Sequence, residues 1–217
     1  MLRSTNATAL VLAFALAIAP PGVRAAGTLD EGRLDPAWFP GAGELREANE
    51  IDYLWVKQGF ELDGKKLRFA PWPEPEFLGE KASARDTKDI RLAKQMATTM
   101  HEVFSEAFTA AFKQRIELVD AGEQVRVEGR IVDASTGATA AKVLVGFGAG
   151  SGSTTVDVRF VDAASGELLV ALHHRAVSGT SWSTTDSKFV GWVDEMAKEA
   201  AKSGFEKLWT KGDRVKE

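Results

Sequence analysis

Four glycines at alternate positions form the stretch of the sequence that most resembles a ligand-binding motif: Gly146, Gly148, Gly150 and Gly152, within VGFGAGSG. Glycine-rich loops hold phosphate when they open a helix, because the first amides of a helix are free to donate. A dinucleotide-binding motif would need glycine where Ser151 stands, and a P-loop would need a lysine, which is absent from 143–160. Residues 154–158 favour a strand, so we interpret the glycines as a structural connection that binds no cofactor.

The three histidines could in principle serve as metal ligands. His173 and His174 are neighbours on a predicted strand, so their side chains point to opposite faces and cannot bind one ion together. His101 lies on a predicted helix, where a two-histidine metal site needs its partner four positions on, and that position is Ser105. We expect surface or edge positions for all three histidines and no metal site.

Nucleophilic and acid–base catalysis find equally little support. The segment 179–183 (GTSWS) lies between a predicted strand and a predicted helix, where a nucleophile elbow would lie, but it ends in serine and no histidine follows it. The carboxylates are scattered, with no pair spaced as an acid and a base. We therefore predict no catalytic residues and interpret the protein as a non-enzyme.

Tryptophans are the remaining candidates for contact with a ligand, because their flat rings stack on sugar faces. Of the six, Trp192 and Trp209 fall on the apolar stripe of a predicted helix. The others could contact a ligand or a partner protein: Trp38, Trp55, Trp72 and Trp182. Packing of the same rings against the domain is the alternative use.

Two long amphipathic helices must position these residues. Between Asp86 and Gln114 the apolar residues recur at steps of three and four, with Asp86 or Thr87 as the N-cap. The same spacing predicts a second helix over 186–211. Both helices have one apolar face, which must pack on a sheet.

Between the helices the period of the apolar residues changes to two, which is typical of strands. Alternation predicts strands over 125–131, 156–160 and 168–172, the first two with one polar face, and an earlier strand over 66–72. A turn pattern with Asp and Gly follows two of the strands, at 133–137 and 162–166.

These elements predict an α/β (α+β) fold, a two-layer sandwich. Its sheet is mixed and mostly antiparallel, and both helices cover one face. We expect the polar face of the sheet to be exposed to solvent, because the helices are needed on the apolar face only.

The chain divides into four segments by composition. Residues 1–25 have the polar leader, short apolar run and small residues before a cleavage site that are typical of a signal peptide, and the apolar run is too short for a permanent membrane anchor. Residues 26–65 form an aromatic-rich extension, 66–211 the α/β domain, and 212–217 a charged tail. Export to the periplasm is predicted, with an extracellular location as the alternative.

Charge and cysteine content exclude several partners. The 27 basic and 31 acidic side chains give a net charge of −4. The basic residues are scattered, which argues against nucleic acid and against an anionic membrane surface. The absence of cysteine rules out disulfides and lipid attachment through an N-terminal cysteine.

The glycine run at 145–150, the Val-Asp-Val at 156–158 and the VDAASGE segment at 161–167 resemble a family of exported bacterial envelope proteins. It is known as a domain of unknown function (the four-four-one-zero family). The resemblance covers roughly residues 67–209. It implies an α/β domain similar to those of envelope assembly factors and supplies no catalytic residues. Members are often lipoproteins, and this chain departs from them in lacking cysteine.

The sequence therefore predicts a non-enzymatic interaction or assembly protein of the periplasm or cell envelope. It would bind an unidentified envelope protein through the exposed sheet face, an edge strand or the extension. The alternative is a small-ligand or glycan-binding module that uses Trp38, Trp55 or Trp72. The sequence is also compatible with a homo-oligomer.

Overall fold

Helix α1 (Thr87–Phe112) is the longest element of the computed structural model, which describes residues 34–78, 82–136, 152–177 and 185–208. Asp86 is its N-cap: the carboxylate accepts hydrogen bonds from the amides of Lys88 (2.7 Å) and Asp89 (2.9 Å). The prediction of this helix and its cap is confirmed.

The second predicted helix is divided in two. Helix α3 (Thr185–Ser203) ends at Gly204, whose φ of 74° is left-handed, and α4 (Phe205–Leu208) follows. Glycine adopts this conformation without strain and commonly ends helices. The prediction of one continuous helix over 186–211 is therefore wrong, although Phe205 and Leu208 remain buried on the same side.

Seven strands form one sheet in the order β1-β2-β7-β6-β5-β3-β4. Strand β3 is parallel to both β4 and β5, and every other neighbouring pair is antiparallel, which confirms a mixed, mostly antiparallel sheet. Both edge strands are very short. The strands are β1 (Arg46–Ala48), β2 (Ile51–Val56), β3 (Lys66–Phe69), β4 (Glu117–Leu118), β5 (Val125–Ser135), β6 (Ser153–Asp162) and β7 (Leu168–Val177).

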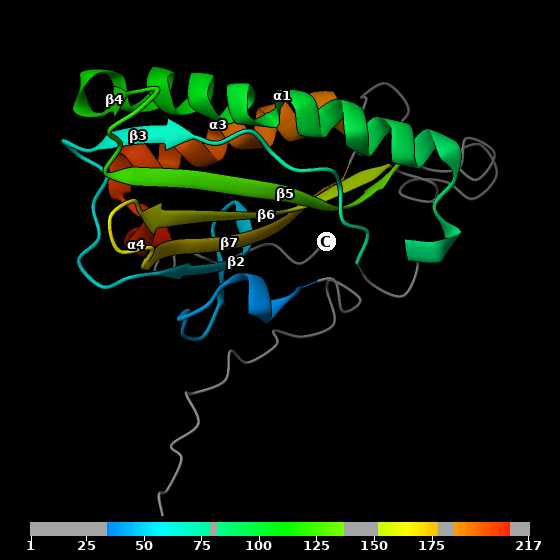
Figure 1. Ribbon diagram of the computed structural model, residues 1–217, viewed down its shortest axis with the longest axis horizontal. Coiled ribbons are helices and arrows are strands. Elements are labelled where there is room, and N and C mark those ends of the chain that lie inside the picture. Colours follow the sequence, from blue (N-terminus) through cyan, green and yellow to red (C-terminus); the bar gives the residue numbers. More distant parts are fainter. Residues whose placement is uncertain (1–33, 79–81, 137–151, 178–184, 209–217) are drawn as a thin grey trace, which may run out of the picture.

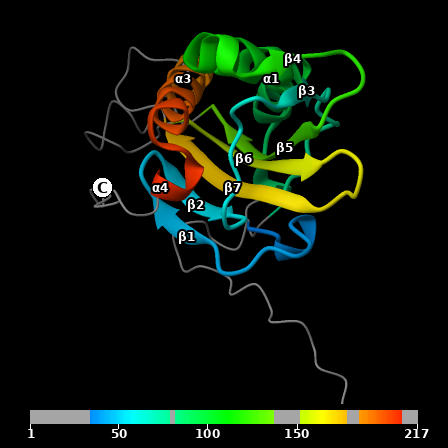
Figure 2. The same ribbon diagram turned by 90° about the vertical axis from the view of Figure 1, so that its left-hand side faces the viewer.

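Helices α1 and α3 lie side by side on one face of the sheet (Figures 1 and 2). Between them and the strands lies the main core, rich in stacked phenylalanines. Phe108 of α1 contacts Phe160 of β6 at 5.8 Å between ring centroids, and Phe205 of α4 contacts the same strand residue at 5.3 Å. The predicted arrangement of two helices on one face is confirmed.

The opposite face of the sheet is not open to solvent, contrary to prediction. Residues 34–45, which include the short 3₁₀ helix η2 (Pro36–Trp38), lie against it and form a second apolar cluster with strands of the sheet. Phe39, Leu45 and Tyr53 are buried there. Residues 46–56, predicted as part of an extension, form β1 and β2. Arg130 and Asp157 on this face are buried and pair across neighbouring strands, and Glu128 and Arg159 pair in the same way but are partly buried.

Two further 3₁₀ helices, η3 (Ala82–Ala84) and η4 (Lys113–Arg115), flank α1. The proline-rich segment between β3 and η3 runs along β5, where the amides of Glu76 and Leu78 donate to the carbonyls of Ile131 and Val132, each at 2.9 Å. No helix in the described part of the chain is long and apolar enough to cross a membrane.

The two predicted turns differ in outcome. Asp162 closes a turn as predicted: its carboxylate accepts hydrogen bonds from the amides of Ala164 and Ser165, and Gly166 has a φ of 73°. Asp133 instead lies inside β5 and binds Arg85 through two hydrogen bonds of 2.6 and 2.7 Å. That part of the prediction is wrong because β5 continues to pair with β6 as far as Ser135.

Trp72 crosses over Gly129 in the main core, so that a Cβ atom added to this glycine would lie 2.3 Å from the indole ring. The ring cannot move aside easily because it is buried and packs on Phe104 at 5.6 Å. We expect Gly129→Ala to destabilise the protein by ~1–3 kcal/mol through overpacking. Urea unfolding followed by tryptophan fluorescence measures this, with Gly191→Ala as the control, since a Cβ at Gly191 meets open space. Equal stabilities of the two variants would contradict the prediction.

Candidate functional site

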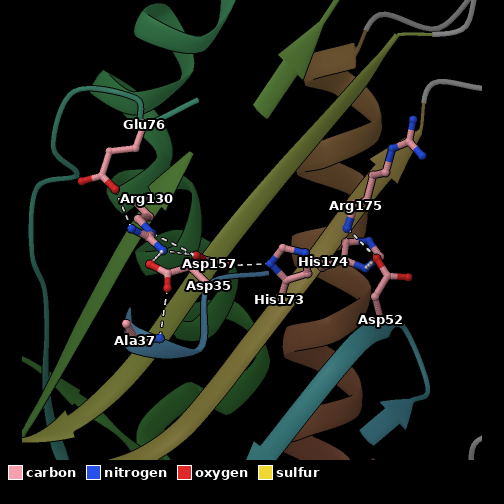
Figure 3. A network of polar contacts seen from close by, with 9 residues as sticks. All are labelled: Asp35, Ala37, Asp52, Glu76, Arg130, Asp157, His173, His174 and Arg175. Carbon is pink, nitrogen blue, oxygen red and sulfur yellow. Dashed lines mark hydrogen bonds and ion pairs between the residues drawn. The ribbon is translucent and has the colours of Figure 1, made fainter. Parts of the chain in front are cut away.

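Three polar side chains stand in one row across neighbouring strands on the face covered by residues 34–45. The strand register places Arg130 of β5 opposite Asp157 of β6, and Asp157 opposite His173 of β7. Arg130 Nε donates to Asp157 Oδ2 at 2.9 Å, and His173 Nδ1 lies 2.5 Å from Asp157 Oδ1 (Figure 3). The side chains of Arg130, Asp157 and His173 are 4%, 0% and 0% exposed.

Arg130 also binds two carboxylates from distant segments. Its Nη1 lies 2.5 Å from Glu76 and its Nη2 lies 3.0 Å from Asp35. We name Arg130, Asp157, His173, Asp35 and Glu76 the buried ionic cluster. Burial alone would lower the pKa of Arg130, but Asp157 foremost and then Asp35 and Glu76 raise it above the ordinary value. The guanidinium therefore stays charged. It joins residues 34–45, which we call the N-terminal segment, to the proline-rich segment and the sheet.

Trp38 attaches the N-terminal segment at a second place. The guanidinium carbons of Arg130 and Arg159 lie over its ring at 4.8 and 4.5 Å from the centroid. Arg159 also donates to the Trp38 carbonyl at 2.8 Å and binds Glu128 at 2.7 Å. Both cation–π contacts and the hydrogen bond stabilise the covered state of this sheet face.

His174, the next residue along β7, lies on the other face. Its Nδ1 is 3.1 Å from Asp52 Oδ2, and its ring stacks on Trp192 of α3 at 4.1 Å. The prediction that the two neighbouring histidines point to opposite faces is confirmed. The prediction that they lie at the surface is wrong, because each is buried beside a carboxylate.

Glu128 makes the stability of this face sensitive to acid. Burial raises its pKa, but hydrogen bonds from Arg126 and Arg159 outweigh burial, so the pKa lies below its ordinary value. A lowered folded-state pKa contributes stability above the unfolded-state pKa of about 4.3 and loses it as pH falls through the folded value. We expect the free energy of unfolding to fall as pH drops below about 4.3, and Glu128→Gln to flatten that fall. Urea unfolding at a series of pH values measures both; identical pH profiles would contradict the prediction.

The arrangement of Asp157 and His173 is chemically that of an acid–base pair, but no solvent reaches it in this structure. The side chains instead hold three segments of the chain together. In the described residues, no group of three His, Asp or Glu side chains could hold a metal ion.

An accessible hollow lies elsewhere, between α1 and the β3–β4 edge of the sheet. We name it the edge groove; it has a volume of about 430 Å³ and mixes apolar with charged side chains. Its lining residues are Leu67, Arg68, Phe69, Pro71, His101, Glu102, Ser105, Leu118, Val119 and Asp120. The groove places His101 of α1 at the sheet edge, in agreement with the surface or edge position predicted for it.

The tryptophans predicted as contact residues are not brought together. Trp72 is a core residue, which corrects its predicted surface role, and Trp38 is held by Arg130 and Arg159. Trp55 is partly buried beside Gly43, where an added Cβ would lie 2.9 Å from its indole nitrogen. Trp182 lies outside the described residues.

Of the four glycines, Gly152 alone falls within the described residues, and it directly precedes strand β6. The prediction that a strand follows the glycine run is confirmed. Gly146, Gly148 and Gly150 lie outside the described residues, so their role as a structural connection stays a prediction.

Comparison with solved structures gives several similar folds. PelC from Paraburkholderia phytofirmans, a dodecamer, is 8% identical with a TM-score of 0.47 and covers 67% of this chain and 94% of its own. Protein XCC0632 from Xanthomonas campestris is 9% identical (TM-score 0.39; 72% and 91% covered). Lipoprotein GNA1162 from Neisseria meningitidis is 12% identical (TM-score 0.38; 64% and 99% covered). No curated protein matches the chain.

The fold and its buried cluster define an α+β sandwich whose second sheet face is closed by its own N-terminal segment. The family model described as "Domain of unknown function (DUF4410)" matches residues 57–181, more than half of the chain. The protein belongs to this family, which confirms the resemblance seen in the sequence. The match includes every residue that lines the edge groove, whereas Asp35, Trp38 and Asp52 precede it.

Proposed function

We propose that the protein is a non-enzymatic interaction protein of the bacterial cell envelope, which binds a partner protein at the edge of its sheet. The observation that carries the proposal is the edge groove: an outer strand, β4, borders a hollow on the surface, and Leu118 on that strand is 38% exposed. An edge strand beside a hollow can accept a strand of a partner protein by β-strand addition.

The buried ionic cluster supports a role other than catalysis. Its histidine and carboxylate have the chemistry of a general acid and base, but His173 and Asp157 bind each other, Asp157 also accepts from Arg130, and both side chains are fully buried. A catalytic group must reach the proton that it transfers. We therefore assign the proposed interaction function to the exposed edge groove and not to the buried ionic cluster.

The signal peptide predicted over residues 1–25 supports envelope localisation. An exported protein without cysteine depends on its core and ion pairs for stability, and this chain has two apolar clusters and a dense set of charged contacts. The proposed location of the exported protein is the periplasm.

Site-specific photo-crosslinking in the native envelope tests the proposal. A photoreactive amino acid is placed at Leu118 on the groove, and at Lys198 on the exposed side of α3 as the control. We expect a discrete adduct of one mass from position 118 and none from position 198. An adduct with the mass of two copies would identify a homo-oligomer. Equal labelling at both positions, or none at either, would contradict an interaction at this edge.

A further inference from the structure

Within the described residues, no backbone partner is found for the outer edge of strand β4. The amides of Glu117 and Val119 donate to the carbonyls of Lys65 and Leu67, each at 3.0 Å, so these residues face β3. Backbone groups alternate in direction along a strand, so the N–H and C=O of Leu118 between them face away from the sheet. Since β4 is the last strand in the order, a further strand could pair there.

The groove beside this edge is lined by both apolar and charged side chains. Its volume of about 430 Å³ falls within the range of ligand pockets, roughly 300–1,000 Å³. Phe69, which is partly buried, and Leu118, which is 38% exposed, supply apolar surface. An incoming strand could therefore bury alternate side chains in the groove while its backbone pairs with β4.

The charges of the groove favour a basic ligand. Arg68, a cation in its lining, is neutralised by Glu123 at 2.9 Å. The carboxylates of Glu102 and Asp120 are exposed, and no Lys, Arg or His within the described ranges forms an ion pair with either. Two uncompensated negative charges beside an apolar surface complement a cationic side chain with an apolar stem.

We propose that the edge groove binds an extended basic segment of another protein, which pairs with Leu118 as an added strand and places a lysine or arginine against Glu102 and Asp120. This inference rests on the proposed function and names the chemistry of the partner. Backbone pairing supplies affinity that is independent of sequence, and the two carboxylates supply selectivity for positive charge.

Fluorescence anisotropy with two labelled peptides tests the inference on the full chain. The first peptide has the alternating sequence TVKVTVT, and in the second glutamate replaces the lysine. We expect saturable binding of the lysine peptide and at least several-fold weaker binding of the glutamate peptide. Binding of the lysine peptide should weaken at high salt, because the contacts are exposed.

Substitutions in the groove separate the contribution of the carboxylates from that of backbone pairing. Glu102→Gln and Asp120→Asn should each weaken binding of the lysine peptide by about two- to fivefold, the range of exposed ion pairs. Glu106→Gln is the matched control, since Glu106 is exposed on the same helix but does not line the groove. Leu118→Pro removes the outward N–H and should weaken both peptides by about three- to tenfold relative to Leu118→Ala, which keeps it.

The carboxylate variants keep the test decisive if Leu118→Pro is unstable. The inference is overturned if the lysine peptide shows no saturable binding below about 1 mM. It is equally overturned if the two peptides bind with the same affinity, or if Glu102→Gln and Glu106→Gln behave alike. If position 118 still gives a photo-adduct while Glu102→Gln/Asp120→Asn leaves adduct yield unchanged, the basic-segment inference fails and the interaction function stands.

Discussion

Asp157→Ala should lower the free energy of unfolding by ~3–5 kcal/mol, because it leaves the charge of buried Arg130 without its innermost partner. This is a large share of the ~5–15 kcal/mol that stabilises a typical domain. For a protein of this size the expected fall in melting temperature is roughly 6–20 °C. Calorimetry or urea unfolding measures the change.

Glu76→Gln provides the matched control for this prediction. Glu76 binds the same guanidinium, but its side chain is 52% exposed, so its loss should cost at most about 1 kcal/mol. Replacing both members of the inner pair, as Arg130→Met/Asp157→Leu, should recover part of the loss, since no unpaired charge remains. A cost below about 1 kcal/mol for Asp157→Ala would show that the pair does not stabilise the fold.

Phe108→Ala should destabilise the protein by ~3–5 kcal/mol through a cavity at the centre of the main core. The ring of Phe108 is fully buried and contacts rings from three other elements of the structure, β3, β6 and α4. Its centroid lies 5.5 Å from Phe69, 5.8 Å from Phe160 and 6.3 Å from Phe205. The surrounding rings belong to the sheet, to α1 itself and to α4, and their packing prevents the site from collapsing to fill the space.

Ile90→Ala on the same helix is the control for the core variant. Ile90 is 38% exposed, and an alanine there should change the free energy of unfolding by no more than about 0.5 kcal/mol. Urea unfolding of both variants, with far-UV circular dichroism as the signal, tests the pair. A similar small effect for both would contradict the assignment of Phe108 to the centre of the core.

The helices and central strands could be predicted from the sequence because their signals are local. The spacing of apolar residues in α1 and the carboxylate of Asp86 at its start need no knowledge of the fold. The break at Gly204 also had a local signal, since a glycine lies within the periodic segment. There the continuing apolar stripe of Phe205 and Leu208 concealed the end of α3.

The buried polar face could not be predicted from alternation alone. A strand with arginine, glutamate and aspartate on one side has the same pattern whether these residues meet water or one another. The register of strand pairing determines whether these residues meet water or one another. Here Arg130 lies opposite Asp157, and Glu128 lies opposite Arg159. The opposite signs at corresponding positions of two predicted strands, together with the aromatic residues of the N-terminal segment, were the available signals.

The edge groove depends on contacts that the sequence does not show. The two-residue strand β4 is too short to produce a periodic pattern, and its pairing with β3 brings together residues about fifty positions apart. Glu102 and Asp120 come from a helix and from the loop after an edge strand. Their common location follows from the packing of α1 over β3.

The long sequence separation between the N-terminal segment and its binding site has a consequence for biosynthesis. Asp35 and Trp38 are bound by residues 95 and 121 positions further along the chain. The ribosome synthesises the N-terminal segment before the strands that it covers. Its apolar side chains, including Phe39, therefore lack their packing partners until β5, β6 and β7 have been made. Closure of this sheet face therefore cannot precede the synthesis of β7 (Leu168–Val177).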